Sequence, residues 1–173
     1  LVVAGEHSGD QHAAKVVADL LAARPGLRIA AFGGPRLRAA GAQLLFDMTT
    51  FSAVGIVEIL SAYPFYRRLF NRMVDWTLQW KPKVVVLVDY PGLNLRLADE
   101  LRKAGLSRAG FGGTAVIQYV SPQLWAWKPK RRFTMARDLD SVGTIFPFEP
   151  ACYADTKLDA RFVGHPFAEK EHV

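Results

Sequence analysis

The first 24 residues constrain the fold most, because they predict a strand, a tight turn and a helix in immediate succession. The apolar residues 1–4 end at Gly5, and residues 11–24 repeat apolar side chains at helical spacing. Ser8, followed by Gln11 three positions later, fits a capping box, so the helix is expected to begin at Ser8 or Gly9. This arrangement is the first half of a β-α-β unit.

The turn after this strand has two interpretations. It would lie at the carboxyl end of the strand, beside a helix N-terminus whose N–H groups favour anions, where open α/β sheets bind ligands. Alternatively, Gly5 and Gly9 only permit a tight turn. The spacing leaves both interpretations open, because it is neither G-x-G-x-x-G nor a Walker motif with its lysine.

The rest of the chain alternates apolar runs with helical patterns. Strands are expected over residues 27–32, 43–46, 83–88, 114–120, 141–146 and 161–163, and helices over residues 36–40, 94–104 and 149–156 and after Pro129. Asn94 is expected to cap the helix of residues 94–104, and Gly105 to end it. This alternation predicts an α/β domain with a doubly wound, mostly parallel sheet.

Composition narrows the classes of function. The 22 Lys and Arg residues exceed the 16 Asp and Glu residues, and the net charge of +6 favours an anionic partner such as phosphate, anionic lipid or nucleic acid. The single Cys152 excludes an internal disulfide and agrees with a reducing compartment. No zinc-like spacing of His and Cys and no DxD-type carboxylate pair is present in the sequence, so no metal site is predicted.

Residues 52–80 combine aliphatic and aromatic side chains with three arginines. One interpretation is a pair of buried helices that Pro64 separates, with the arginines at the edge. The other is an interfacial surface whose apolar side chains enter lipid while the arginines contact headgroup phosphates. The residues expected at such a surface are Ile56, Ile59, Leu60, Phe65, Arg67 and Arg68.

Two more stretches hold candidate site residues. Asp89 follows a β-branched run typical of a central parallel strand, and its position suits a general base, with a turn or capping carboxylate as the alternative. Trp125 and Trp127 lie beside five basic residues, which would suit base stacking and phosphate contacts, although a core or pocket-wall role is more usual. His165, which precedes a proline, is expected to mark a domain exit rather than a ligand.

Seven short sequence motifs are distributed over almost the whole length of the chain. They are AGEHSGD (4–10), FGGPRLRAAG (32–41), VGIVEIL (54–60), VDYPGLNLRLA (88–98), YVSPQLWAWKPKR (119–131), FPFE (146–149) and FVGHP (162–166). Together they resemble the lipid-A-disaccharide synthase family, inverting glycosyltransferases of bacterial outer-membrane biogenesis. His7, Ala13 and a longer loop over residues 107–113 depart from the usual family pattern.

The resemblance implies the Rossmann-like amino-terminal domain of a GT-B-like glycosyltransferase. Such an enzyme joins UDP-2,3-diacylglucosamine to 2,3-diacylglucosamine 1-phosphate and releases UDP, without a metal or other cofactor. Residues 1–163 would form the acceptor-side domain and residues 164–173 the start of the interdomain crossing, so the donor domain is expected to be absent from this chain. The resemblance also implies a cytoplasmic protein that is peripheral on the inner face of the bacterial inner membrane, and it is compatible with a homo-oligomer.

Matching positions carry the family's roles to individual residues. Asp89 would take the proton of the acceptor hydroxyl. Ser8 and Gly9 would hold phosphate or hydroxyl groups, Glu6 and Asp10 would bond sugar hydroxyls, Asn94, Ser121 and Gln123 would line the pocket, and Trp125 and Trp127 would form its apolar walls.

Two rival classes of function remain from the sequence. A dinucleotide-binding oxidoreductase on a similar sheet requires a glycine fingerprint and an acidic residue after the second strand, where this chain has Phe32, Gly33 and Gly34. A basic nucleic-acid-binding module would show a salt-dependent gel shift, and none is expected.

Overall fold

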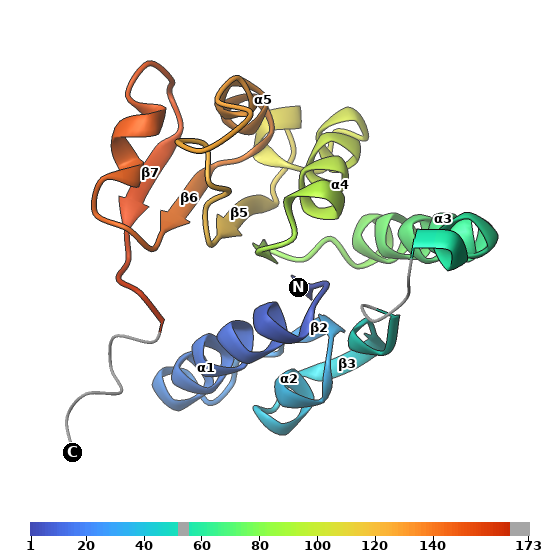
Figure 1. Ribbon diagram of the computed structural model, residues 1–173. Helices are drawn as coiled ribbons and strands as arrows, with labels where there is room; N and C mark the ends of the chain where they lie inside the picture. Colours follow the sequence, from blue (N-terminus) through green and yellow to red (C-terminus); the bar gives the residue numbers. More distant parts are fainter. Residues whose placement is uncertain (52–55, 167–173) are drawn as a thin grey trace.

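The computed structural model describes residues 1–51 and 56–166, and for residues 51 and 56–62 it describes the backbone alone. Within these residues the strands form one seven-stranded parallel sheet (Figure 1). The strands are β1 (Val2–Ala4), β2 (Ala30–Gly33), β3 (Gln43–Asp47), β4 (Val84–Val88), β5 (Ala115–Tyr119), β6 (Ser141–Thr144) and β7 (Asp159–Phe162). The helices are α1 (His7–Ala23), α2 (Pro35–Ala39), α3 (Ile56–Trp80), α4 (Pro91–Lys103) and α5 (Arg131–Asp138), with 3-10 helices η1 (Thr49–Phe51), η2 (Arg108–Gly110) and η3 (Glu149–Tyr153).

The strand order is β3-β2-β1-β4-β5-β6-β7, which confirms the predicted doubly wound α/β fold. The order reverses between β1 and β4, whose pairing runs from Val2 with Val86 to Ala4 with Val88. The loops after these two strands leave the same edge of the sheet and diverge. They therefore form the crevice in which sheets of this kind bind ligands.

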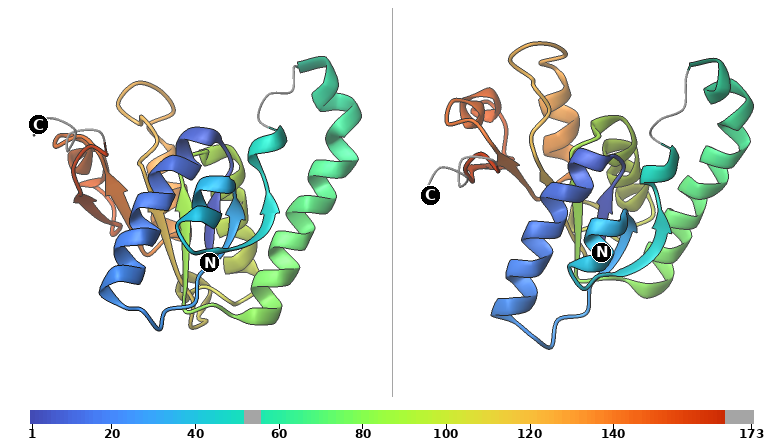
Figure 2. Two further views of the ribbon diagram at one scale, coloured as in Figure 1. Left: turned by 90° about the horizontal axis from the view of Figure 1, so that it is seen from below. Right: turned by 60° about the horizontal axis from the view of Figure 1, so that its bottom comes forward.

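Apolar cores lie on both faces of the sheet. On one face, covered by α1 and α2, Val17 belongs to the same cluster as Val2. On the other, covered by α3, α4 and α5, Met73 and Leu97 belong to the cluster of Val3 (Figures 1 and 2). Neighbouring residues of β1 serve different cores because successive side chains of a strand point to opposite faces.

Two predicted helix starts are wrong. α1 begins at His7 with Glu6 as its N-cap residue and without a side-chain cap, so the capping box of Ser8 does not form. Only two residues connect β1 to α1, and the first turn closes when the Asp10 N–H donates to the Glu6 carbonyl at 2.9 Å. α4 begins at Pro91, since proline at the first helical position needs no N–H partner, and Asn94 therefore lies inside the helix.

The prediction that Pro64 separates two helices is also wrong, because α3 continues through it. Leu69, Phe70 and Met73 are buried and fix the helix to the sheet, while Pro64 lies on its exposed side, where water can replace the lost backbone bond. The amino-terminal end of α3 projects beyond the body of the domain (Figure 2). In the described part of the chain, no helix has the length and apolarity needed to cross a membrane.

Candidate functional site

Backbone strain is concentrated in the loops that follow β4 and β5. Asp89 and Tyr90 have φ angles of 51° and 39°, and Val120 and Lys128 have φ angles of 67° and 52°. A left-handed φ costs a non-glycine residue on the order of 1–3 kcal/mol and is exceptional for a β-branched valine, and such residues cluster at functional sites. The edge of the sheet predicted to bind ligands is therefore also an edge that stores strain.

Two buried amides hold the strained turn at Asp89. The Asn94 Nδ2 donates to the carbonyls of Asp89 at 2.7 Å and Val88 at 3.1 Å, and the Gln118 Nε2 donates to the Asp89 carbonyl at 2.9 Å. Both amide side chains are fully buried, whereas Asp89 is half-buried. Asn94 is thus not the pocket-lining residue that was predicted, because it lies beneath the turn and fixes the backbone of Asp89.

Asp10 has a structural role in place of the predicted contact with a sugar. Its carboxylate is 1% exposed and accepts hydrogen bonds from the N–H groups of Gly34 at 2.7 Å, Arg36 at 3.0 Å and Leu37 at 3.2 Å, at the start of α2. A Cβ at Gly34 would lie 2.6 Å from the Asp10 Oδ2, so glycine permits this close approach. Because both oxygens are occupied, Asp10 ties α1 to α2 and is unavailable to a sugar hydroxyl.

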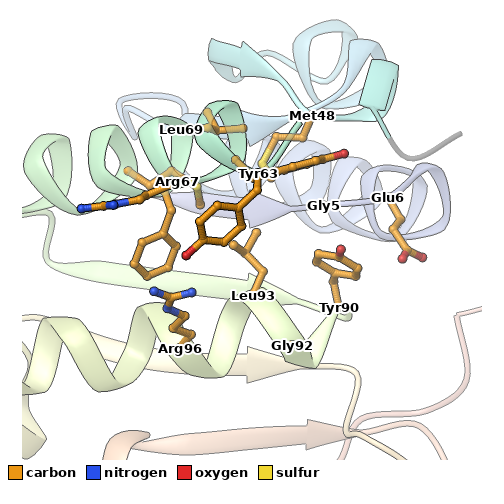
Figure 3. Close-up of a pocket in the computed structure, with 13 residues that line it drawn as sticks. Gly5, Glu6, Met48, Tyr63, Arg67, Leu69, Tyr90, Gly92, Leu93 and Arg96 are labelled. Atoms are coloured by element: carbon orange, nitrogen blue, oxygen red, sulfur yellow. The ribbon is translucent and has the colours of Figure 1, made fainter. Parts of the chain in front are cut away.

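A cavity of ≈ 440 Å³ opens between α3, α4 and the turns after β1 and β4 (Figure 3). Its lining combines apolar side chains (Met48, Leu69, Phe70, Met73, Leu93), polar or charged ones (Glu6, Tyr63, Tyr66, Arg67, Tyr90, Arg96) and two glycines (Gly5, Gly92). Figure 3 shows Arg67 and Arg96 at one end of the cavity and Glu6 at the other. An apolar volume with a few placed polar groups is typical of a small-molecule site.

Tyr90 lies between this cavity and the end of β1. A Cβ at Gly5 would lie 2.7 Å from the Tyr90 Cδ1, so the glycine allows the aromatic ring to rest on the turn. Burial, and then the nearby Glu6 carboxylate, raise the pKa of Tyr90 above its ordinary value. Its hydroxyl therefore stays protonated at neutral pH and can donate a hydrogen bond to a ligand.

Three other residues that were predicted to bind the acceptor lie near the crevice or behind it. Ser8 is exposed in the first turn of α1, and Gly9 is buried against β4, where a Cβ would lie 3.5 Å from the Val88 carbonyl oxygen. Ser121 is buried with its hydroxyl 2.8 Å from that of Tyr153, whose pKa burial raises to about 12. Ser121 is therefore part of the core beneath the site rather than of the pocket lining.

The predicted site residues in the loop after β5 do not line this cavity. Gln123 is exposed, and Trp125 packs edge-on against Phe148 with ring centroids 5.7 Å apart. Trp127 lies under the Lys128 ammonium, which is 4.2 Å from the ring centroid. The two tryptophans are 53% and 58% exposed and do not line this cavity, so their role as apolar walls of the acceptor pocket stays a prediction.

Sequence patterns do not predict the two histidines that act electrostatically near Asp89. Burial lowers the pKa of His12 on α1, the Asp89 carboxylate opposes that shift, and His165 adds to it. His165 reaches this edge because the chain turns at Gly164, which has a φ of 85°, and its ring lies 5.7 Å from that of Phe146. Across the described residues, no group of three or more His, Cys, Asp or Glu side chains could hold a metal ion.

The side chains predicted to contact a membrane divide into three groups. Those of Ile56, Ile59 and Leu60 lie outside the described residues. Phe65 is half-buried and its ring centroid lies 6.1 Å from that of Phe46, so its contact with lipid stays a prediction. Arg67 and Arg68 are exposed, as an interfacial surface requires.

Comparison with known proteins identifies the family. The family model described as lipid-A-disaccharide synthetase matches residues 1–173. Lipid-A-disaccharide synthase 1 of Legionella pneumophila (strain Paris) is 40% identical over 98% of this chain and 42% of the relative's length. The lipid-A-disaccharide synthase of Anaeromyxobacter dehalogenans is 42% identical over 98% of the chain and 42% of its own, and that of Trichlorobacter lovleyi 37% identical over 100% and 43%.

The chain thus spans less than half the length of these curated relatives. Their names give no support to an oxidoreductase or to a nucleic-acid-binding module. They agree with the seven ordered sequence stretches and with the doubly wound sheet. The chain belongs to the lipid-A-disaccharide synthetase family.

Proposed function

We propose that this chain is the acceptor-binding half of an inverting, metal-independent glycosyltransferase of lipid A biosynthesis. The whole enzyme joins UDP-2,3-diacylglucosamine to 2,3-diacylglucosamine 1-phosphate and releases UDP. In this proposal residues 1–163 form the acceptor-side domain, and residues 164–173 begin the crossing to a donor domain. Family membership supports the activity, and the parallel Rossmann-like sheet supports the GT-B assignment.

One observation carries the placement of the acceptor: the mostly apolar cavity lies directly beside the turn of Asp89 and Tyr90. An acylated sugar needs an apolar volume for an acyl chain and polar groups near its reacting hydroxyl. Leu69, Phe70 and Leu93 supply the apolar volume. The acyl chain therefore enters between α3 and α4, and the sugar lies over the turn.

Asp89 acts as the general base in a single displacement. Its carboxylate takes the proton of the acceptor hydroxyl while that oxygen bonds to C1 of the donor sugar. The bond from C1 to the UDP oxygen breaks on the opposite face, and UDP leaves with the electron pair. Asn94 and Gln118 fix the Asp89 backbone before substrate binds, which reduces the reorganisation needed for reaction. Glu6, Ser8 and Gly9 are the proposed contacts for sugar hydroxyls or phosphate.

The test is Asp89→Asn in the full enzyme that carries this chain, with UDP release as the assay. The rate should fall by about 10²–10⁴-fold while acceptor binding is retained, because the amide keeps the size of the side chain and loses the base. Asp19→Asn is the matched control, since that carboxylate is 72% exposed on α1. Near-normal turnover of the Asp89 variant would assign this carboxylate to the turn alone.

Peripheral binding to the inner face of the bacterial inner membrane is part of the same proposal. Both sugars carry acyl chains, which reside in a bilayer. The projecting end of α3 and the exposed Tyr63, Arg67 and Arg68 support α3 as the contact (Figure 2). Formation of a homo-oligomer stays a prediction from the family resemblance.

A further inference from the structure

A second and strongly basic groove adjoins the acceptor cavity. It has a volume of ≈ 810 Å³ and lies between the first turns of α4 and both α5 and the segment that precedes it. Its charged lining consists of Arg96, Lys128, Lys130, Arg131 and Arg137 against the single carboxylate of Asp99. The proposed reaction steps make no use of these cations.

Most of this positive charge is not neutralised within the protein. Arg137 is paired, with its Nη2 2.9 Å from Asp99 and its Nε 2.7 Å from Asp138. For the other four cations of the groove, no carboxylate of residues 1–51 or 56–166 forms a salt bridge. Like charges held together in one concave surface repel each other and attract an anion.

Local structure holds two of these cations in place. The Lys128 ammonium lies 4.2 Å from the centroid of the Trp127 ring and the Arg131 guanidinium 5.7 Å from it, within cation–π range. Lys128 also has a left-handed φ of 52°. Trp127 is exposed, so core packing does not explain why it lies against two cations beside a groove. Binding of an anion in the groove would explain it.

The groove and the acceptor cavity share a boundary. Gly92 and Arg96 line both, and the groove begins at Pro91, two positions after Asp89. The Arg96 guanidinium lies 4.8 Å from the centroid of Phe70, which lines the cavity. One ligand can therefore place an apolar chain in the cavity and an anionic group in the groove.

We propose that this basic groove binds the phosphomonoester of an acylated ligand whose acyl chain occupies the adjoining cavity. The inference rests on the proposed function, in which this group is the 1-phosphate of the acceptor. A phosphomonoester carries close to two negative charges at neutral pH and offers three acceptor oxygens, which suits several adjacent lysines and arginines. Arg96 at the boundary would donate N–H groups of its guanidinium to the phosphate while the face of that guanidinium stays on Phe70.

The test measures binding of three short-chain ligands to the 173-residue chain by isothermal titration calorimetry. They are 2,3-diacylglucosamine 1-phosphate, the same sugar without phosphate, and a monoacylglycerol phosphate. Inorganic phosphate is titrated in parallel, and co-sedimentation with phosphatidylglycerol vesicles is measured for each variant. Lys128→Gln and Arg131→Gln remove groove charges, and Arg38→Gln on α2 is the matched control. Each groove variant should bind the phosphorylated sugar about tenfold more weakly, with no change for the dephosphorylated sugar or for the control.

The outcomes separate this inference from the proposed function. Equal wild-type affinity for the two sugars, with no effect of the groove variants, overturns the groove and leaves the acceptor role intact. Groove-dependent binding of the monoacylglycerol phosphate alone supports the groove and overturns the acceptor role. Inorganic phosphate binding as tightly as the acylated ligand overturns the coupling between groove and cavity. Variants that lose only co-sedimentation with phosphatidylglycerol vesicles would reveal a headgroup site and overturn the proposal.

Discussion

At the scale of single residues, Asp10 shows how one buried carboxylate can fix two helices. Asp10→Asn would keep the volume but leave one acceptor oxygen for the three N–H groups at the start of α2, with an amide N–H facing the others. We expect the free energy of unfolding to fall by about 2–3 kcal/mol. Urea denaturation measures it, and Asp19→Asn on the exposed side of α1 should be nearly neutral. Equal stability of the two variants would contradict the capping role.

His12 makes stability depend on pH near neutrality. Its pKa is lowered from 6.5 in the folded state, first by burial, so the unfolded chain binds the proton more readily. The contribution is fully present above pH 6.5 and is lost as the pH falls through the lowered folded-state pKa.

We therefore expect the free energy of unfolding to decrease between about pH 7.5 and about pH 5.5 more steeply in the wild type than in His12→Gln. Burial also lowers the pKa of the N-terminal amine, to about 6, and this contribution is common to both proteins and cancels in the comparison. Parallel pH profiles from chemical denaturation would show that His12 does not titrate differently on folding.

At the scale of elements, α3 is fixed at one end by buried side chains and projects at the other. If the exposed arginines contact anionic lipid, Arg67→Gln with Arg68→Gln should weaken co-sedimentation with phosphatidylglycerol vesicles by about 30-fold, since each juxtamembrane cation contributes about 1 kcal/mol. The thermal midpoint should change little, because both side chains are exposed. Arg36→Gln with Arg38→Gln on α2 is the control. Vesicle binding unchanged in the α3 variant would exclude these two arginines from the contact.

Local sequence patterns predicted where the helices and strands lie better than they predicted the residues at which the helices begin. The β-branched run at β4 and the glycine that ends α4, Gly105 with a φ of 70°, were read correctly because both depend on neighbouring residues alone. The capping box at Ser8 failed because a two-residue connection from β1 leaves no room for it. Likewise Pro91 starts α4 before Asn94 can cap it.

Side-chain roles that depend on distant contacts could not be predicted from the sequence. Asp10 binds backbone groups 24 to 27 positions later in the chain. Trp125 packs edge-on against Phe148, a residue that follows β6 in the chain. Asp89 could be proposed as the base because its residue type, its position at a strand end and the family resemblance coincide. Its partners Gln118 and His12 carry no such signal.

At the scale of the whole molecule, the two-faced core predicts that the chain folds cooperatively without a donor domain. On the proposed function it should bind acceptor and yet release no measurable UDP. Holding the acceptor oxygen and donor C1 in one geometry supplies roughly 7–11 kcal/mol of a barrier, and that contribution requires both halves. Calorimetric unfolding and a UDP assay with both lipid substrates test the two statements. Robust UDP release would show that the donor site lies within these residues.

The central position of β1 has a consequence for synthesis on the ribosome. Val2 pairs on one side with Ala31, but its other neighbour, Val86, is translated much later. At 5–20 residues per second the nascent chain waits roughly 4–17 s with one edge of its central strand unpaired. Such an edge is a template for wrong pairing between chains, so this protein should depend on nascent-chain chaperones until β4 has emerged.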